Sequence, residues 1–169
     1  MRLLPLIMCL FPLSGCASIP VNYSSNLSGG AIEVTDFTQD DLKPVRKKFD
    51  ERVALGDKHI IFIINSWGGS IFSGLDLIDH VVNAKKVHGV YTSCIVSSKA
   101  ASMAVVMLES AACDQRLALK HSFFLAHNGS TSVKGTVEEI QESKEILDVI
   151  NEGMAQIVGS RTFDWGRSL

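Results

Sequence analysis

Clustered positive charge, metal-binding spacings and long apolar runs are all scarce in this chain of 169 residues. The run RKK at residues 46–48 is followed by Asp50 and Glu51, which is typical of a solvated helix face and not of a nucleic-acid surface. The 4 cysteines and 5 histidines show no spacing that fits a zinc site. We therefore expect no nucleic-acid partner, no metal and no cofactor.

The apolar stretch at residues 3–13 is about half as long as a membrane-spanning helix, which needs roughly 20 residues. Arg2 precedes it, so the stretch predicts an export signal and not an anchor helix. The next residues, LSGC at 13–16, resemble the bacterial lipobox. An ordinary signal peptide that happens to contain a cysteine is the alternative.

The lipobox resemblance implies cleavage before Cys16 and lipid attachment to its thiol. Residues 1–15 would then be a lipoprotein signal peptide, and residues 16–30 a lipidated polar tether. Ala17 is not acidic, which by resemblance to sorted lipoproteins of Gram-negative bacteria favours the outer membrane. We expect an exported protein, anchored by lipid on the periplasmic side of a bacterial membrane.

Two cysteines of the mature chain, Cys94 and Cys113, lie in apolar segments. A disulfide between them is allowed in an oxidising compartment. Buried cysteines are more commonly free, so we expect two buried thiols.

The composition, with 46% hydrophobic and 20% charged residues, is that of a globular domain. The continuous apolar run HIIFIIN at residues 59–65 predicts a strand buried on both faces, as in a parallel sheet. Strand and helix patterns alternate along the chain, which predicts an α/β domain. The expected strands are 31–37, 59–65, 89–96 and 116–127, and the expected helices lie between 38 and 56 and at 71–84, 100–112 and 136–158.

Residues that could act on a substrate occur at the junctions after these strands. In SWGGS, adjacent glycines allow backbone N–H groups to point into one space and hold an oxyanion, although a plain tight turn is an equal alternative. Ser102 starts a helix, where it could be a nucleophile or only a helix cap. His127 ends the next apolar strand, where it could be a general base or a surface group.

Taken together and in this order, these segments resemble the ClpP-type serine peptidases of the ClpP/crotonase superfamily. The resemblance covers residues 32–159. It implies an α/β, ClpP/crotonase-like fold with repeated β-β-α units and a long handle helix. The expected domain spans residues 31–169. The matching segments are INSWGGSIFSGLDLID at 64–79, KAASMAVVMLESAACDQRLAL at 99–119, SFFLAHN at 122–128 and the capped helix at 136–158.

The resemblance also implies site residues and partners. Ser102 would be the nucleophile and His127 the general base, while the N–H groups of Gly69 and Met103 would form the oxyanion hole. The implied reaction is hydrolysis of a peptide bond through an acyl-enzyme, with peptide or protein substrates. The family assembles into rings through its handle helices, so a homo-oligomer is expected.

Several residues depart from the family pattern. Trp67 replaces a proline and could line a substrate cleft or fill the core. The third triad member of the family is an Asp well beyond the handle helix, whereas Asp164 comes too early and Asp148 lies within the helix, so this member is unknown. We therefore expect a domain that is incomplete and truncated at its C-terminus. Lys99 could act as a base, but we favour a solvated loop lysine.

Two other functions fit the same motifs. The missing Asp favours a catalytically inactive ClpP-fold protein that binds peptides or acts in assembly. A crotonase-like acyl-CoA enzyme shares the paired oxyanion donors, but an exported lipoprotein would rarely meet CoA.

Overall fold

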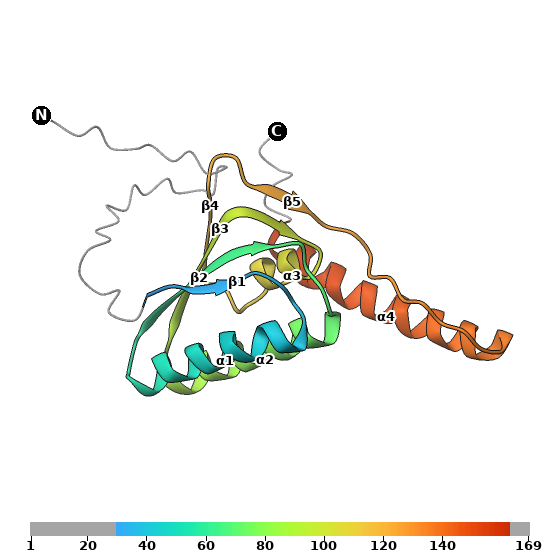
Figure 1. Cartoon of the computed structure of the whole chain (residues 1–169), viewed down its shortest axis with the longest axis horizontal. Coiled ribbons are helices and arrows are strands. Elements are labelled where there is room, and N and C mark those ends of the chain that lie inside the picture. Colours follow the sequence, from blue (N-terminus) through green and yellow to red (C-terminus); the bar gives the residue numbers. More distant parts are fainter. Residues whose placement is uncertain (1–29, 163–169) are drawn as a thin grey trace, which may run out of the picture.

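The computed structural model describes residues 30–162, so the predictions for the signal peptide, for Cys16 and for Asp164 lie outside the described residues. The elements alternate between strand and helix, as the sequence predicts, until two short strands precede the last helix (Figure 1). In chain order they are β1 (Ile32–Val34), α1 (Gln39–Ala54), β2 (His59–Ser66), α2 (Ile71–His88), β3 (Tyr91–Ala101), α3 (Met103–Glu109), β4 (Gln115–Ala118), β5 (Phe123–Leu125) and α4 (Val137–Thr162).

All strand pairs in the sheet are parallel, and the strand order is β1-β2-β3-β4, with β5 also paired to β3. The central strand β3 pairs with β4 over Ser93 to Val96 and with β5 over its last three residues. Because the strands are parallel, their carboxyl ends meet at one edge of the sheet, which is where such sheets bind ligands. The α/β fold class expected from the sequence is confirmed.

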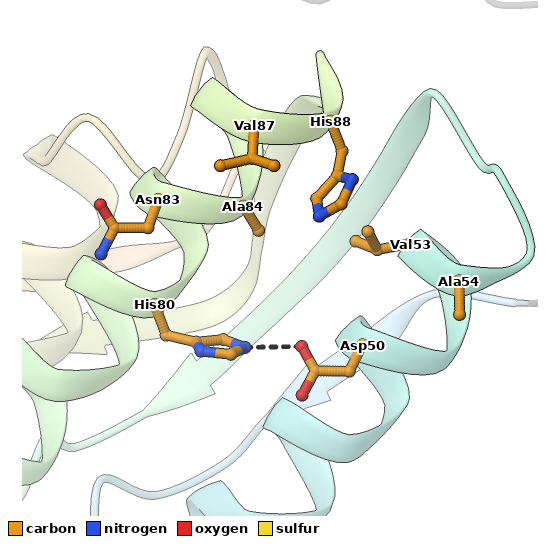
Figure 2. A pocket seen from close by; sticks show the side chains of 8 residues that line it. All are labelled: Asp50, Val53, Ala54, His80, Asn83, Ala84, Val87 and His88. Atoms are coloured by element: carbon orange, nitrogen blue, oxygen red, sulfur yellow. Dashed lines mark hydrogen bonds and ion pairs between the residues drawn. The ribbon is translucent and has the colours of Figure 1, made fainter.

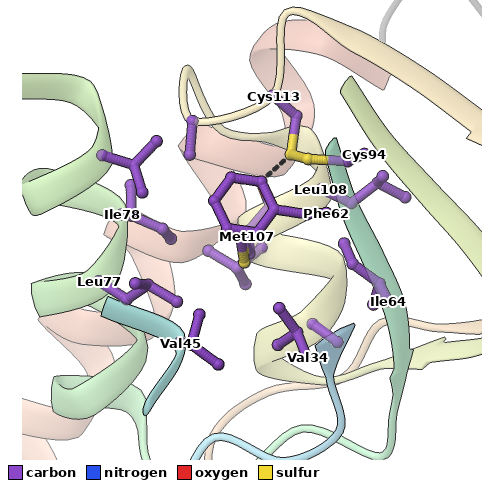
Figure 3. Close-up of a cluster of buried hydrophobic side chains, with 14 of the residues drawn as sticks. Val34, Val45, Phe62, Ile64, Leu77, Ile78, Cys94, Met107, Leu108 and Cys113 are labelled. Carbon is purple, nitrogen blue, oxygen red and sulfur yellow. Dashed lines mark hydrogen bonds between the residues drawn. A yellow bond between two sulfur atoms is a disulfide. The ribbon is translucent and has the colours of Figure 1, made fainter. Parts of the chain in front are cut away.

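One face of the sheet forms the hydrophobic core, and α1 and α2 lie side by side along it (Figure 1). Burial alternates along β2, where Ile60, Phe62 and Ile64 are completely buried and the residues between them are half-buried. Figure 3 shows Phe62 at the centre of this core, among side chains from β1, α1, α2 and α3. The prediction that this strand is buried on both faces is therefore only half right, because the second face is half-buried.

The expectation of two free thiols is wrong, because Cys94 and Cys113 form a disulfide (Figure 3). Their Cα atoms are 5.6 Å apart, and both side chains are completely buried. The chain turns back after α3 and runs beside β3, where Asp114 N donates to Thr92 O at 3.0 Å. This turn, which the sequence pattern does not reveal, brings the two sulfur atoms together.

Helix α4 extends away from the body of the domain (Figure 1). The predicted capping box at its start is confirmed, since Thr136 N donates to Glu139 Oε2 at 2.7 Å and Glu139 N donates to Thr136 Oγ1 at 3.3 Å. The helix exposes apolar side chains along its length, although no helix in residues 30–162 is both long and apolar enough to cross a membrane. The exposed side chains are Val137, Ile140, Ile146 and Val149.

Candidate active site

Ser102 occupies a sharp turn between β3 and α3. Its φ of 54° makes it the one non-glycine residue with positive φ in the described part of the chain. Such a conformation costs about 1–3 kcal/mol and persists where the surroundings enforce it, commonly at functional sites. The Ser102 side chain makes no capping hydrogen bond to α3, so the interpretation of this serine as an ordinary helix cap does not hold. A strained strand–turn–helix corner that presents a serine hydroxyl is typical of nucleophiles.

The turn after β2 packs directly against this corner. A Cβ atom at Gly68 would lie 2.6 Å from Ser102 Cβ and 2.7 Å from Ala101 O, so only glycine fits there. Gly68 also has a φ of 102°, a conformation that side chains disfavour. The first of the two adjacent glycines is therefore needed for close contact with the serine.

The backbone pairing around Gly69 determines where its polar groups point. Phe37 N donates to Gly68 O, and Ser70 N donates to Phe37 O, both at 3.0 Å. In a parallel bridge of this kind, the N–H and C=O of the middle residue point to the opposite edge. Gly69 is exposed, so its N–H is accessible beside the Ser102 corner.

Met103 is the first residue of α3, and its N–H has no acceptor within the helix because the first N–H groups of a helix lack partners. This N–H lies near the glycine turn, since a Cβ at Gly68 would come within 3.0 Å of Met103 N. The structure thus brings together Ser102, Gly69 and Met103, three of the residues that the sequence singles out.

His127 follows β5, which is held against the serine corner. Ser102 N donates to Leu125 O at 2.7 Å, and His127 lies two residues further along the chain. The histidine is exposed, and its Nδ1 lies 2.7 Å from Asn128 O. Within residues 30–160, no hydrogen bond links His127 to Ser102 or to a carboxylate.

Four side chains gather beside this corner, three from β2, β3 and β5 and the fourth, Trp67, from the turn after β2. Lys99 Nζ donates to Asn65 Oδ1 at 2.9 Å and lies 5.2 Å from the centre of the Trp67 ring. The Trp67 ring also meets Phe123 edge to face, with 6.1 Å between ring centres. Trp67 is 66% exposed, which excludes a core-filling role for it.

The expectation of a loop lysine is wrong, because Lys99 belongs to β3 and is half-buried. Sequence reasoning also missed Asn65 and Phe123 as neighbours of the site. The alternation along β2 and β3 places Asn65 and Lys99 on the same face, but the strand register needed to see this is absent from a single sequence.

A separate surface pocket of about 430 Å³ lies between α1 and α2 (Figure 2). His80 Nε2 and Asp50 Oδ1 approach to 2.6 Å across it. All of its lining residues come from these two helices, so it contains none of the expected site residues. No group of three or more potential metal-binding side chains occurs in the described residues.

The family model for Clp protease matches residues 52–165, which is more than half of the chain. The chain belongs to the Clp protease family. This Clp protease match includes the Ser102 corner, the His127 segment and α4.

Two relatives of this Clp protease family member are the ATP-dependent Clp protease proteolytic subunits 2 of Prochlorococcus marinus strains MIT 9313 and MIT 9312. Each is 36% identical over 107 residues, which is 60% of this chain and 52% or 51% of the relative. The chain therefore spans about half the length of the curated relatives it matches.

Proposed function

We propose that this Clp protease family member is a serine peptidase that cleaves peptide bonds through a Ser102 acyl-enzyme. The observation that carries the proposal is the strained Ser102 corner, whose hydroxyl does not cap α3 and which lies beside the N–H groups of Gly69 and Met103. A serine placed this way has donors ready for the oxyanion that forms when its oxygen attacks a carbonyl.

In this mechanism, Ser102 Oγ attacks the carbonyl carbon while His127 Nε2 takes the hydroxyl proton. The N–H groups of Gly69 and Met103 stabilise the negative charge on the carbonyl oxygen. The protonated histidine then gives its proton to the leaving amine as the C–N bond breaks, and water hydrolyses the ester in the same manner. Hydrogen bonds between base and nucleophile commonly form only when substrate binds, and His127 is exposed beside the serine corner.

The base needs an unprotonated Nε2, and the contact of His127 Nδ1 with Asn128 O supports this. A carbonyl oxygen only accepts hydrogen bonds, so Nδ1 donates at this contact, and in the neutral ring the lone pair is then on Nε2. The main-chain carbonyl thus performs the orienting task that a carboxylate performs in a complete triad.

The test is hydrolysis of fluorogenic peptides and an unfolded protein by the purified full-length chain, with a Ser102→Ala variant as the control. We expect the unaltered chain to cleave these substrates without ATP, since an exported protein does not meet cytosolic ATPases. We expect no cleavage by the Ser102→Ala variant. Cleavage that requires an added ATPase partner and ATP would contradict the ATP-independent mechanism.

Absence of cleavage by a folded sample would favour a second function, in which the chain binds peptides or acts in assembly without catalysis. The observation favouring this alternative is that no hydrogen bond joins His127 to Ser102 in the described structure.

We also propose that α4 contacts further copies of the chain. Its exposed apolar side chains, such as Val137 at 79% and Val149 at 70% exposure, favour burial against another protein surface. Sedimentation at a mass above that of the monomer is the expected result, and a monomer at high concentration would contradict it.

Finally, we propose export and lipid anchoring through Cys16, on the periplasmic side of a bacterial membrane. The buried disulfide between Cys94 and Cys113 supports this, because such bonds persist in oxidising compartments and are rare in the cytosol. We expect the unaltered chain in the membrane fraction and a Cys16→Ser variant in the soluble fraction. The same distribution for both chains would contradict the lipid anchor.

A further inference from the structure

We propose that Lys99, Asn65, Trp67 and Phe123 form a subsite that binds a carboxylate of the substrate peptide. The inference rests on the proposed peptidase function, because it assigns the substrate class of that same site. These four residues are called the Lys99 subsite.

Lys99 carries a positive charge that no described carboxylate neutralises. Its hydrogen-bond partner is the neutral amide of Asn65, and no carboxylate lies within ion-pair distance of it among residues 30–160. Two other half-buried basic side chains do have carboxylate partners, since Arg116 pairs with Glu109 and Lys85 with Asp114. A half-buried ammonium without a counter-charge is complementary to an anionic ligand.

The Lys99 ammonium has more N–H donors than its described contacts use. A lysine ammonium carries three. One is directed to Asn65 Oδ1 at 2.9 Å, and the centre of the Trp67 ring lies 5.2 Å from Nζ. At least one donor is left for a ligand oxygen, while the other two contacts fix the position of the charge.

The Lys99 subsite lies close to the Ser102 corner. Lys99 belongs to β3 and precedes Ser102 by three residues. Its register partner on the neighbouring strand β5 is Phe123. Trp67 immediately precedes the glycine turn that touches Ser102. The subsite therefore lies at the carboxyl ends of the strands, beside the bond to be cleaved.

The exposed aromatic rings complete the subsite. Trp67 is 66% and Phe123 is 48% exposed, and their rings meet edge to face. They form an apolar surface next to a fixed positive charge, which suits the aliphatic stem and carboxylate of a glutamate, or the last residue of a peptide with its free C-terminus.

The experiment measures peptide binding to the full-length Ser102→Ala chain, so that binding does not depend on catalysis. One pair of labelled peptides has an amidated C-terminus and differs only by glutamate or glutamine. A second pair has neither residue and differs only by a free or amidated C-terminus. We expect about tenfold tighter binding of the acidic member of one pair, and the pair that shows it identifies the source of the carboxylate.

Matched variants assign the effect to Lys99. In the same background, Lys99→Met should bring the ratio of dissociation constants close to one and Lys99→Glu should invert it. Lys48→Met, a change at an exposed lysine on α1, should keep the ratio. Should a Lys99 variant fail to fold, salt titration replaces it, because the preference of the original chain must fall as ionic strength rises.

The proposed subsite would be overturned by equal affinities within both pairs or by the absence of any peptide binding. A preference that survives Lys99→Met or high salt would overturn it as well. Failure of the peptidase proposal is a different result. In that case the chain that retains Ser102 would bind the acidic peptide but would not cleave it.

Discussion

Replacing His127 with glutamine is expected to lower kcat for peptide hydrolysis by about 10²–10⁴-fold, the usual contribution of a general base. Glutamine can donate and accept hydrogen bonds but cannot take up the proton of Ser102. KM should change little, because the proton transfer occurs in the transition state. Initial rates over a range of peptide concentrations measure both quantities.

His121→Gln is the matched control for this change. His121 is exposed in the turn between β4 and β5, six residues before His127, and carries no proposed role. We expect its kcat to be that of the unaltered chain. An equal loss in both variants, or a loss of less than tenfold in His127→Gln, would contradict the assignment of the base.

Replacing Gly68 with alanine is expected to destabilise the domain by about 3 kcal/mol and to abolish reactivity at Ser102. The new methyl group would lie 2.6 Å from Ser102 Cβ and 2.7 Å from Ala101 O, so the serine corner must move. The φ of 102° adds backbone strain for any residue with a Cβ. Misplacement of a reacting atom by about 1 Å can alone cost about 10²-fold in rate.

Gly153→Ala is the control for the glycine substitution. Gly153 is exposed on α4, and a Cβ there would have no neighbouring atom within 4 Å. Alanine favours a helix over glycine by up to about 1 kcal/mol, so this variant should be slightly more stable. Urea unfolding measures the free energy of unfolding of each variant and of the unaltered chain. If Gly68→Ala were as stable as the unaltered chain, the close packing at Ser102 would be contradicted.

Local sequence signals predicted the parts of the fold that depend on neighbouring residues. The cap at Thr136 lies where the sequence placed it. The sequence also placed Ser102 at the start of a helix, and the structure has it directly before α3. The end of α2 was not predicted, because Gly89, which was expected to begin a strand, instead ends the helix after His88 in the left-handed conformation.

Features that depend on pairing between distant segments were not predictable. The segment from Ser97 to Ala101 was expected to be loop and helix, yet it forms the end of β3 because it pairs with Ser66 and with β5. Helix α3 is correspondingly shorter than the apolar run suggested. The disulfide and the Lys99 subsite have the same origin, because each joins side chains from separate strands and turns.

The central claim is that Ser102 is an activated nucleophile, and a fluorophosphonate probe tests it most directly. The probe reacts with activated serines, and peptide mass spectrometry locates the adduct. We predict one adduct on Ser102 in the purified full-length chain and none in Ser102→Ala. A folded sample that remains unlabelled, or a variant that is labelled equally well, would contradict the account.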